Sequence, residues 1–131
     1  MKIESLLARV RAEARALLLR DWDRSLRAGN HPETTRYNYV LAVSQLAAFL
    51  GEQAPETEAA SHPTMVDGRQ VVAFQAWVIE TRSASTGLNK YKALQQFFGW
   101  LVAEGEIERS PMLEVPKPKA VQELVSPLPE D

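Results

Sequence analysis

Apolar residues recur at helical spacing over most of this chain. Between residues 4 and 29 they fall three or four positions apart, and the Gly29-Asn30 pair that follows is a typical helix stop. A second series begins after His31-Pro32 and runs to Gly51, which we expect to cap that helix. Its apolar members are Tyr39, Ala42, Val43, Leu46, Phe49 and Leu50. The pattern predicts two helical stretches in this half. The first is either one long helix or a short helix followed by a second, and we favour a break near residues 19–21.

The middle of the chain alternates between a loop and a buried helix. Residues 52–63 are rich in Glu, Ala, Pro and Thr and have no periodicity, which indicates a solvated loop. Thr64 stands three residues before Asp67, a spacing that favours a helix cap at Thr64. The residues from 67 to 81 are apolar nearly all round the helix, so we expect this element to be buried between its neighbours.

The stretch from Ser83 to Pro111 predicts a last, long helix with two distinct faces. Ser83 and Ser85 are good N-cap residues, because a hydroxyl accepts from the free amides of a first turn. One face is apolar, with Leu94, Phe97, Phe98 and Leu101 at helical spacing. The other face is polar, free of acids up to Glu104, and carries Ser85, Asn89, Lys92 and Gln96, with Lys90 beside them. About twenty residues make a helix about 30 Å long, enough to pack one face on a core and leave the other in contact with a partner.

The order of residues in this last helix resembles a known family. It is similar to the end of the N-terminal core-binding domain of tyrosine recombinases of the phage-integrase type, where the run reads approximately T-x-x-R-x-x-A-L-x-x-F-F-x-W-L-x-x-x-G-x-I-x-x-N-P. The matching positions are Thr86, Asn89-Lys90, Ala93-Leu94, Phe97-Phe98, Trp100-Leu101, Glu104-Gly105, Ile107 and Ser110-Pro111. The chain departs from the family in two places: Asn89-Lys90 stands where two Arg are frequent, and Ser110 stands for Asn. The second predicted helix fits the family's corresponding helix at Thr35, Tyr39, Val43 and Leu46.

The resemblance implies an all-α fold of the SAM-like kind, with four main helices and an extra helical segment at the N-terminus. It divides the chain into an N-terminal extension (1–14), a core-binding domain (15–112) and a Pro-rich linker (113–131). In the family such a linker leads into a catalytic domain, and residues 127–130 are similar to the start of that segment.

The resemblance also implies a role and a contact surface. The domain clamps double-stranded DNA at a recombination or integration site and positions a catalytic domain that this chain lacks. In the family, the starts of the second and fourth core helices face the major groove. Carried over to this chain, the DNA-binding residues are Thr34, Thr35, Arg36, Asn38, Ser83, Ser85, Thr86, Asn89, Lys90 and Lys92. Helix starts suit phosphates because free amides and the helix dipole both favour an anion.

The family's reaction uses a Tyr nucleophile with Arg and His-type groups, and the family places them in the catalytic domain. No H-x-x-R motif occurs here, and Tyr37, Tyr39 and Tyr91 fall within predicted helices, where Tyr39 and Tyr91 occupy apolar positions. We therefore expect a chain that is not an enzyme and has no catalytic residue.

Metal and cofactor sites have no sequence support. His31 and His62 both stand beside prolines in loop-like stretches, so nothing would fix them as a metal pair. The glycine-rich phosphate-binding motifs are absent, and we expect no small-molecule cofactor.

Composition leaves DNA binding open without supporting it. The formal net charge of the 131 residues is −2, yet residues 81–103 hold Arg82, Lys90 and Lys92 and no acid. No cysteine is present, which is consistent with a reducing compartment, and no apolar run has the length of a signal peptide or a membrane span. With the resemblance, this favours a cytoplasmic protein of bacterial or phage origin, bound to the nucleoid when on DNA.

Two alternatives to DNA clamping stay open at the level of sequence. The first is a helical module that binds a protein partner and no DNA, using its near-neutral surface and its apolar first helix. The second is a small enzyme, for which the sequence offers no site. The resemblance also implies contacts between neighbouring copies on DNA, for which Trp22 and Leu26 of the first helix are candidates, while Trp22 fits a core position at least as well.

Overall fold

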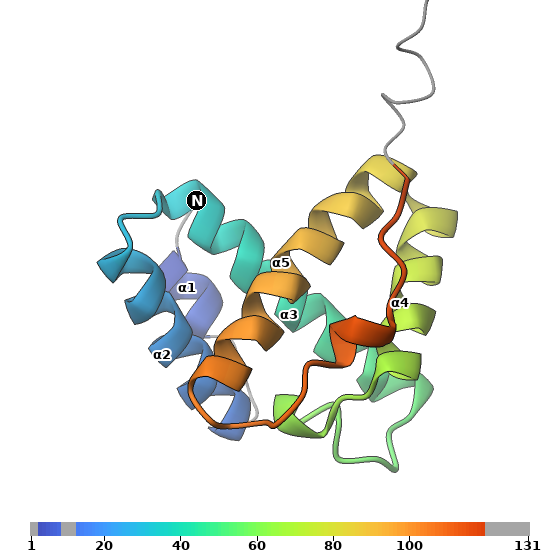
Figure 1. Cartoon of the computed structure of the whole chain (residues 1–131), viewed down its shortest axis with the longest axis horizontal. Helices are drawn as coiled ribbons and strands as arrows, with labels where there is room; N and C mark the ends of the chain where they lie inside the picture. Colours follow the sequence, from blue (N-terminus) through green and yellow to red (C-terminus); the bar gives the residue numbers. More distant parts are fainter. Residues whose placement is uncertain (1–2, 9–12, 120–131) are drawn as a thin grey trace, which may run out of the picture.

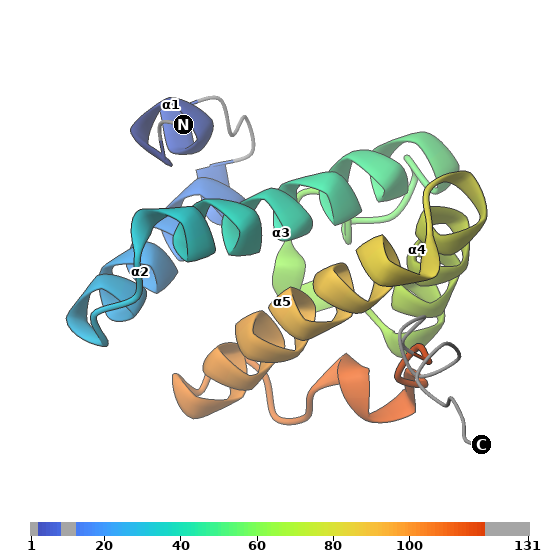
Figure 2. The same cartoon turned by 90° about the horizontal axis from the view of Figure 1, so that it is seen from above.

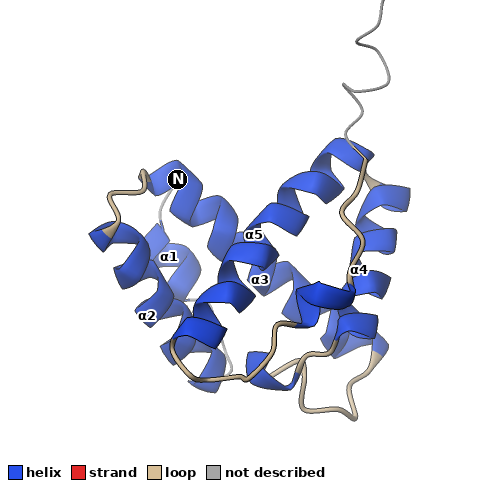
Figure 3. Ribbon diagram, in the orientation of Figure 1, coloured by secondary structure: helices blue, strands red, loops and turns tan. Residues whose placement is uncertain are grey.

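The computed structural model describes residues 3–8 and 13–119, and within these ranges every regular element is helical (Figure 3). Five α-helices and two short 3₁₀ segments follow one another along the chain. They are α1 (Ile3–Ala8), α2 (Glu13–Ala28), α3 (Glu33–Gln53), η1 (Pro63–Met65), α4 (Gly68–Thr81), α5 (Ala84–Ala103) and η2 (Pro111–Glu114). The all-α fold class predicted from the sequence is confirmed.

Helices α3 and α5 form the centre of the molecule and cross each other (Figure 1). The first turns of both helices lie on the same side of the molecule, the upper side in Figure 1, and Figure 2 looks down on that side. Helix α4 packs on both α3 and α5, while α1 and α2 pack on α3 from the other direction. The crossing therefore leaves the first halves of two long helices diverging from a shared core.

Large apolar side chains from every α-helix meet in one core. Trp22 of α2 stacks on Tyr39 of α3 with ring centroids 5.7 Å apart, and it also contacts Phe97 of α5 at 4.9 Å. The other fully or almost fully buried large side chains are Phe74, Phe98, Ile3, Leu19, Leu50, Leu94, Leu101, Val40 and Val71. Trp22 and Leu26 are both buried, so the expectation that they contact a neighbouring copy is wrong for these two side chains.

Helix α2 runs without interruption from Glu13 to Ala28, so the break predicted near residues 19–21 is wrong. Leu19, Trp22 and Leu26 all face the core, and one continuous helix buries all three. The predicted stop is confirmed: Asn30 adopts φ 64°, and the amide of His31 donates to the carbonyl of Leu26 at 3.0 Å.

Helix boundaries differ from the prediction at two caps. Helix α3 continues through Gly51 to Gln53, with Ala54 as its C-cap. Helix α4 is capped by Asp67 rather than Thr64: Asp67 Oδ1 accepts from the amide of Gln70, and the Gln70 side chain accepts from the amide of Asp67, both at 2.9 Å. This reciprocal capping box satisfies two amides that would otherwise lack partners.

Helix α4 is less buried than its composition predicted. Phe74 and Val78 face the core, but Val72 and Trp77 remain exposed, Trp77 to 46%. The prediction of burial all round is wrong because α4 packs on α3, α5 and η2, and these neighbours leave part of its circumference open to solvent.

The two ends of the described chain belong to the packed domain. In α1, Ile3, Leu6 and Leu7 are buried, and the amide of Ile3 donates to Glu33 at the start of α3 (3.2 Å). After α5, Met112 and Val115 are buried against the α4 and α5 side of the core. Packing thus continues three residues past the linker boundary expected at residue 112. The similarity noted at residues 127–130 lies outside the described residues.

Two residues of α4, Gln75 and Ile79, hold the start of α5 in one register. Gln75 is buried and donates through Nε2 to the carbonyl of Gly87 at 3.0 Å. Gly87 allows the two helices to approach closely, because a Cβ at this position would lie 2.5 Å from Cγ1 of Ile79.

Candidate functional site

The first halves of α3 and α5 enclose a polar hollow of about 440 Å³ on the upper side of the molecule in Figure 1. We call it the first hollow. It is lined by Thr35, Asn38 and Tyr39 from α3 and by Thr86, Asn89, Lys90, Lys92 and Ala93 from α5. No carboxylate lines it, and two of its side chains are cations. Its electrostatic character therefore favours an anion.

Local sequence explains why these side chains stand where they do. Pro32 is the N-cap residue of α3, and its restricted φ favours a helix start at this point. Thr35 and Asn38 are three residues apart in the helix and therefore lie about one turn apart on the same face. Ser83 caps α5: its Oγ accepts from the amide of Thr86 at 3.0 Å and donates to the hydroxyl of Thr86 at 2.9 Å. The Thr86 hydroxyl keeps its own proton for another acceptor.

The structure brings together most, but not all, of the residues that the sequence singled out. Thr35, Asn38, Thr86, Asn89, Lys90 and Lys92 line the first hollow. Thr34 and Ser85 are exposed but do not line it, and Ser83 uses its hydroxyl in the helix cap.

Arg36 does not belong to this surface, which corrects its assignment as a DNA-binding residue. Its side chain turns towards α2 and is only 11% exposed, and its Nε lies 3.4 Å from Oδ1 of Asp23, itself a buried residue. Arg27 approaches the second oxygen of the same carboxylate at 3.2 Å. Successive side chains on a helix point about 100° apart, so Thr35 faces the hollow while Arg36 faces the helix behind it.

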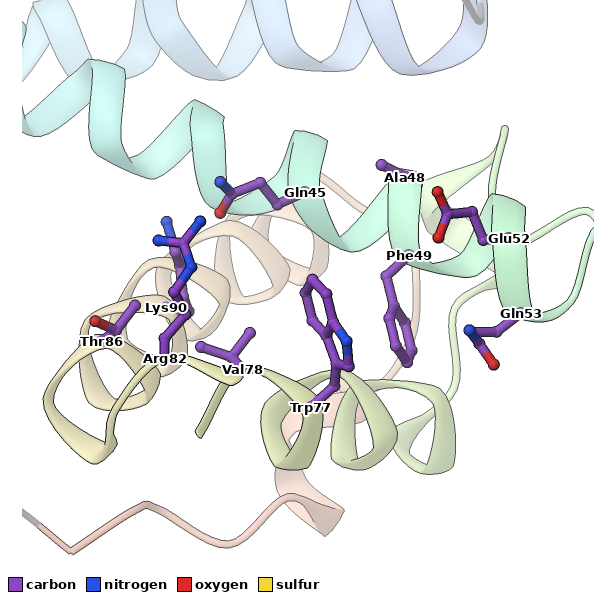
Figure 4. A pocket seen from close by; sticks show the side chains of 10 residues that line it. All are labelled: Gln45, Ala48, Phe49, Glu52, Gln53, Trp77, Val78, Arg82, Thr86 and Lys90. Carbon is purple, nitrogen blue, oxygen red and sulfur yellow. The ribbon is translucent and has the colours of Figure 1, made fainter. Parts of the chain in front are cut away.

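A second hollow adjoins the first one and was not foreseen from the sequence. It occupies about 220 Å³ between α3, α4 and the start of α5, and it shares Thr86 and Lys90 with the first hollow. Its other lining residues are Gln45, Ala48, Phe49, Glu52, Gln53, Trp77, Val78 and Arg82 (Figure 4). Phe49 and Trp77 are in contact, with ring centroids 5.3 Å apart, and form an apolar wall.

Two functional candidates, Tyr39 and Arg82, were missed by sequence reasoning. Tyr39 was expected in the core with its hydroxyl at the surface, and it is half-buried, with one ring face on Trp22 and part of its surface lining the first hollow. Arg82 is the C-cap residue of α4, and the sequence analysis counts it only among the basic residues between positions 81 and 103. A basic residue at that turn, followed directly by the Ser83 cap, was the available signal.

Lys90 stands between the two hollows in an environment that disfavours its charge. It is half-buried, and burial, followed by repulsion from Arg82, lowers the pKa of its ammonium group from 10.5. A lowered lysine pKa means that the folded protein holds this cation at a cost, which an anion nearby would offset.

The described part of the chain offers neither a metal site nor a membrane span. No group of three or more His, Asp or Glu side chains is placed to hold a metal ion there. Within residues 3–8 and 13–119, no helix is both long enough and apolar enough to cross a membrane.

Fold and surface together define the class: a small all-α domain of the SAM-like kind, with a cationic polar hollow between its two central helices. The family model described as "Phage integrase, N-terminal SAM-like domain" matches residues 18–106. The chain therefore belongs to this family, that of the tyrosine recombinases of the phage-integrase type. Comparison with curated proteins and with solved structures finds no match.

Proposed function

We propose that this domain binds double-stranded DNA as the core-binding part of a site-specific tyrosine recombinase, and that it positions a separate catalytic domain. The observation that carries the proposal is the first hollow: two helices distant in sequence contribute hydroxyl, amide and ammonium groups to one surface without a carboxylate. Family membership supports the same conclusion.

The side chains of the first hollow suit the two tasks of DNA recognition. Thr35 and Thr86 stand near helix starts, where hydroxyls and free amides bind phosphate oxygens. Asn38 and Asn89 carry both a donor and an acceptor, the combination that reads an adenine edge. Lys90 and Lys92 supply the charge that phosphate binding needs. The two helices thus offer contacts to the DNA phosphates at their starts and contacts to the DNA bases one or two turns later.

The near-neutral composition sets the expected strength of binding. With two phosphates neutralised by Lys90 and Lys92, the slope of log affinity against log salt is about −2. Binding by this domain alone is therefore weak and falls with salt, and tight binding in a full recombinase requires the catalytic domain as well.

Charge reversal on the first hollow tests the proposal. We expect Lys90→Glu with Lys92→Glu to abolish duplex binding, measured by fluorescence anisotropy with a labelled duplex at about 50 mM salt. The matched control is Arg69→Glu with Arg109→Glu, which changes the net charge by the same amount at two exposed positions that line neither hollow. The control should bind more weakly by a few-fold at most, because remote charges are screened.

The outcomes separate the proposal from its rival. Equal loss in both double variants would mean that only net charge matters, and the first hollow would not be the interface. No binding by the unmodified domain, even at low salt, would favour the helical protein-interaction module. Melting curves should show both double variants folded, since Lys92, Arg69 and Arg109 are exposed and Lys90 is half-buried.

A further inference from the structure

One end of the second hollow concentrates positive charge that nothing in the described chain neutralises. Arg82 and Lys90 lie next to each other there, together with Thr86 and Gln45 (Figure 4). The ion pairs of the described residues involve Arg24, Arg27 and Arg36, and none includes Arg82 or Lys90. Glu52, the acid that lines this hollow, lies at its other end, beyond Phe49 and Trp77 (Figure 4).

The apolar wall makes this charge more costly and an anion there more favourable. Trp77 stands between Phe49 on one side and the two cations on the other (Figure 4). Lys90 is half-buried while Arg82 is exposed, and burial together with repulsion from Arg82 lowers the pKa of the Lys90 ammonium group. Two like charges held in such a place repel each other, and an oxyanion between them converts that repulsion into two attractions.

The donors at this end match one phosphodiester group. A guanidinium presents two parallel N–H groups to two oxygens, and an ammonium adds a third donor from another direction. Thr86 and Gln45 provide further donors within the same lining. The remaining surface, formed by Trp77 and Val78, is apolar and suits the carbon face of a sugar.

We propose that the second hollow holds a segment of the DNA backbone, with a phosphate between Arg82 and Lys90 and the adjoining deoxyribose against Trp77. This inference rests on the proposed function and extends its interface from α3 and α5 onto α4. Because Thr86 and Lys90 line both hollows, a strand that leaves the first hollow enters the second one without a gap.

Arg82→Gln tests the phosphate contact, since it removes the charge and keeps most of the side chain. We expect duplex affinity to fall about tenfold at low salt, the order of one charge-assisted hydrogen bond. The log–log salt slope should become shallower by about 0.9, and the loss should be the same for duplexes of different sequence. Arg69→Gln, which removes an exposed arginine from the opposite end of α4, is the matched control and should leave both quantities unchanged.

Two further variants test the geometry. Trp77→Leu should weaken duplex binding a few-fold with an unchanged salt slope, because an apolar contact releases no counterion. Arg82→Gln combined with Lys90→Gln should weaken binding by less than the product of the single effects, because both cations hold the same phosphate. Multiplicative effects would contradict a shared phosphate.

Failure of this inference is distinguishable from failure of the proposed function. If Arg82→Gln binds like the unmodified protein while Lys92→Gln binds more weakly and with a shallower slope, DNA occupies the first hollow alone and the inference is wrong. If neither variant alters affinity or slope, both proposals are wrong.

Discussion

Arg36 provides a sharp test of how the structure separates a folding role from a binding role. It is a cation at the start of α3, next to Thr35, yet its side chain is buried against Asp23. We predict that Arg36→Met lowers the free energy of unfolding and leaves the duplex affinity of the folded protein within about twofold of the original.

The magnitude follows from what the substitution leaves behind. Removing one partner of a buried ion pair costs about 3–5 kcal/mol, because the other charge stays buried without compensation. Arg27 still approaches Asp23 at 3.2 Å, and the 3.4 Å contact between Arg36 and Asp23 makes no hydrogen bond, so we expect a smaller loss of about 2 kcal/mol. For a domain of this size, that corresponds to a fall in melting temperature of about 8 °C.

A double variant isolates the pair. Asp23→Leu with Arg36→Met removes both charges and should recover most of the lost stability, since an apolar pair of similar volume is often as stable as a buried ion pair. Thermal melting followed by circular dichroism gives the stability, and anisotropy with a labelled duplex well below the melting temperature gives the affinity.

The reasoning is refuted by the reverse pattern. If Arg36→Met melts at the same temperature and loses duplex binding, the guanidinium faces outward onto DNA. If the double variant is no more stable than Arg36→Met alone, the 3.4 Å approach to Asp23 contributes nothing to the fold.

Two other predictions concern the start of α5. Gly87→Ala should destabilise the domain by about 1–2 kcal/mol, because its Cβ would meet Ile79 at 2.5 Å. Gly99→Ala in the same helix meets nothing within 4 Å and should stabilise the domain by up to about 1 kcal/mol. Urea unfolding measures both changes, and equal effects would contradict the close packing of α4 on α5. Duplex affinity should decline as the pH rises through the lowered pKa of Lys90, because binding needs its ammonium form, and Lys90→Arg should remove that part of the decline. The other charged side chains of the two hollows are Arg82, Glu52 and Lys92, and a decline that persists unchanged in Lys90→Arg would assign it to a group other than Lys90.

The sequence was most informative about which side chains of a single helix face the core and which face solvent. On α5, the apolar series from Leu94 to Leu101 is buried, so the polar stripe with Asn89 and Lys92 had to face away from the core. On α3, the sequence did not determine which of Thr35 and Arg36 faces the hollow. That choice depends on Asp23 of α2, whose position follows from how two helices pack and not from any local pattern.

The second hollow was beyond sequence reasoning for a related reason. Phe49, Trp77 and Arg82 come from three different parts of the chain, and each is unremarkable in its own segment. Trp77 had been assigned to a fully buried helix, because an apolar residue among apolar neighbours gives no sign that one side lacks cover. Only the packing of α4 on α3 makes an aromatic wall beside two cations.

The hydrogen bond from Gln75 to the carbonyl of Gly87, together with the close contact of Gly87 with Ile79, has a consequence for the energetics of recognition. Helix α5 is held on α4 before any ligand arrives, so the association of a ligand with α5 spends little conformational entropy on ordering that helix. If the proposed duplex binds and the domain moves around it, we expect α4 and α5 to move together as one unit, with the bending in segments outside this helix pair.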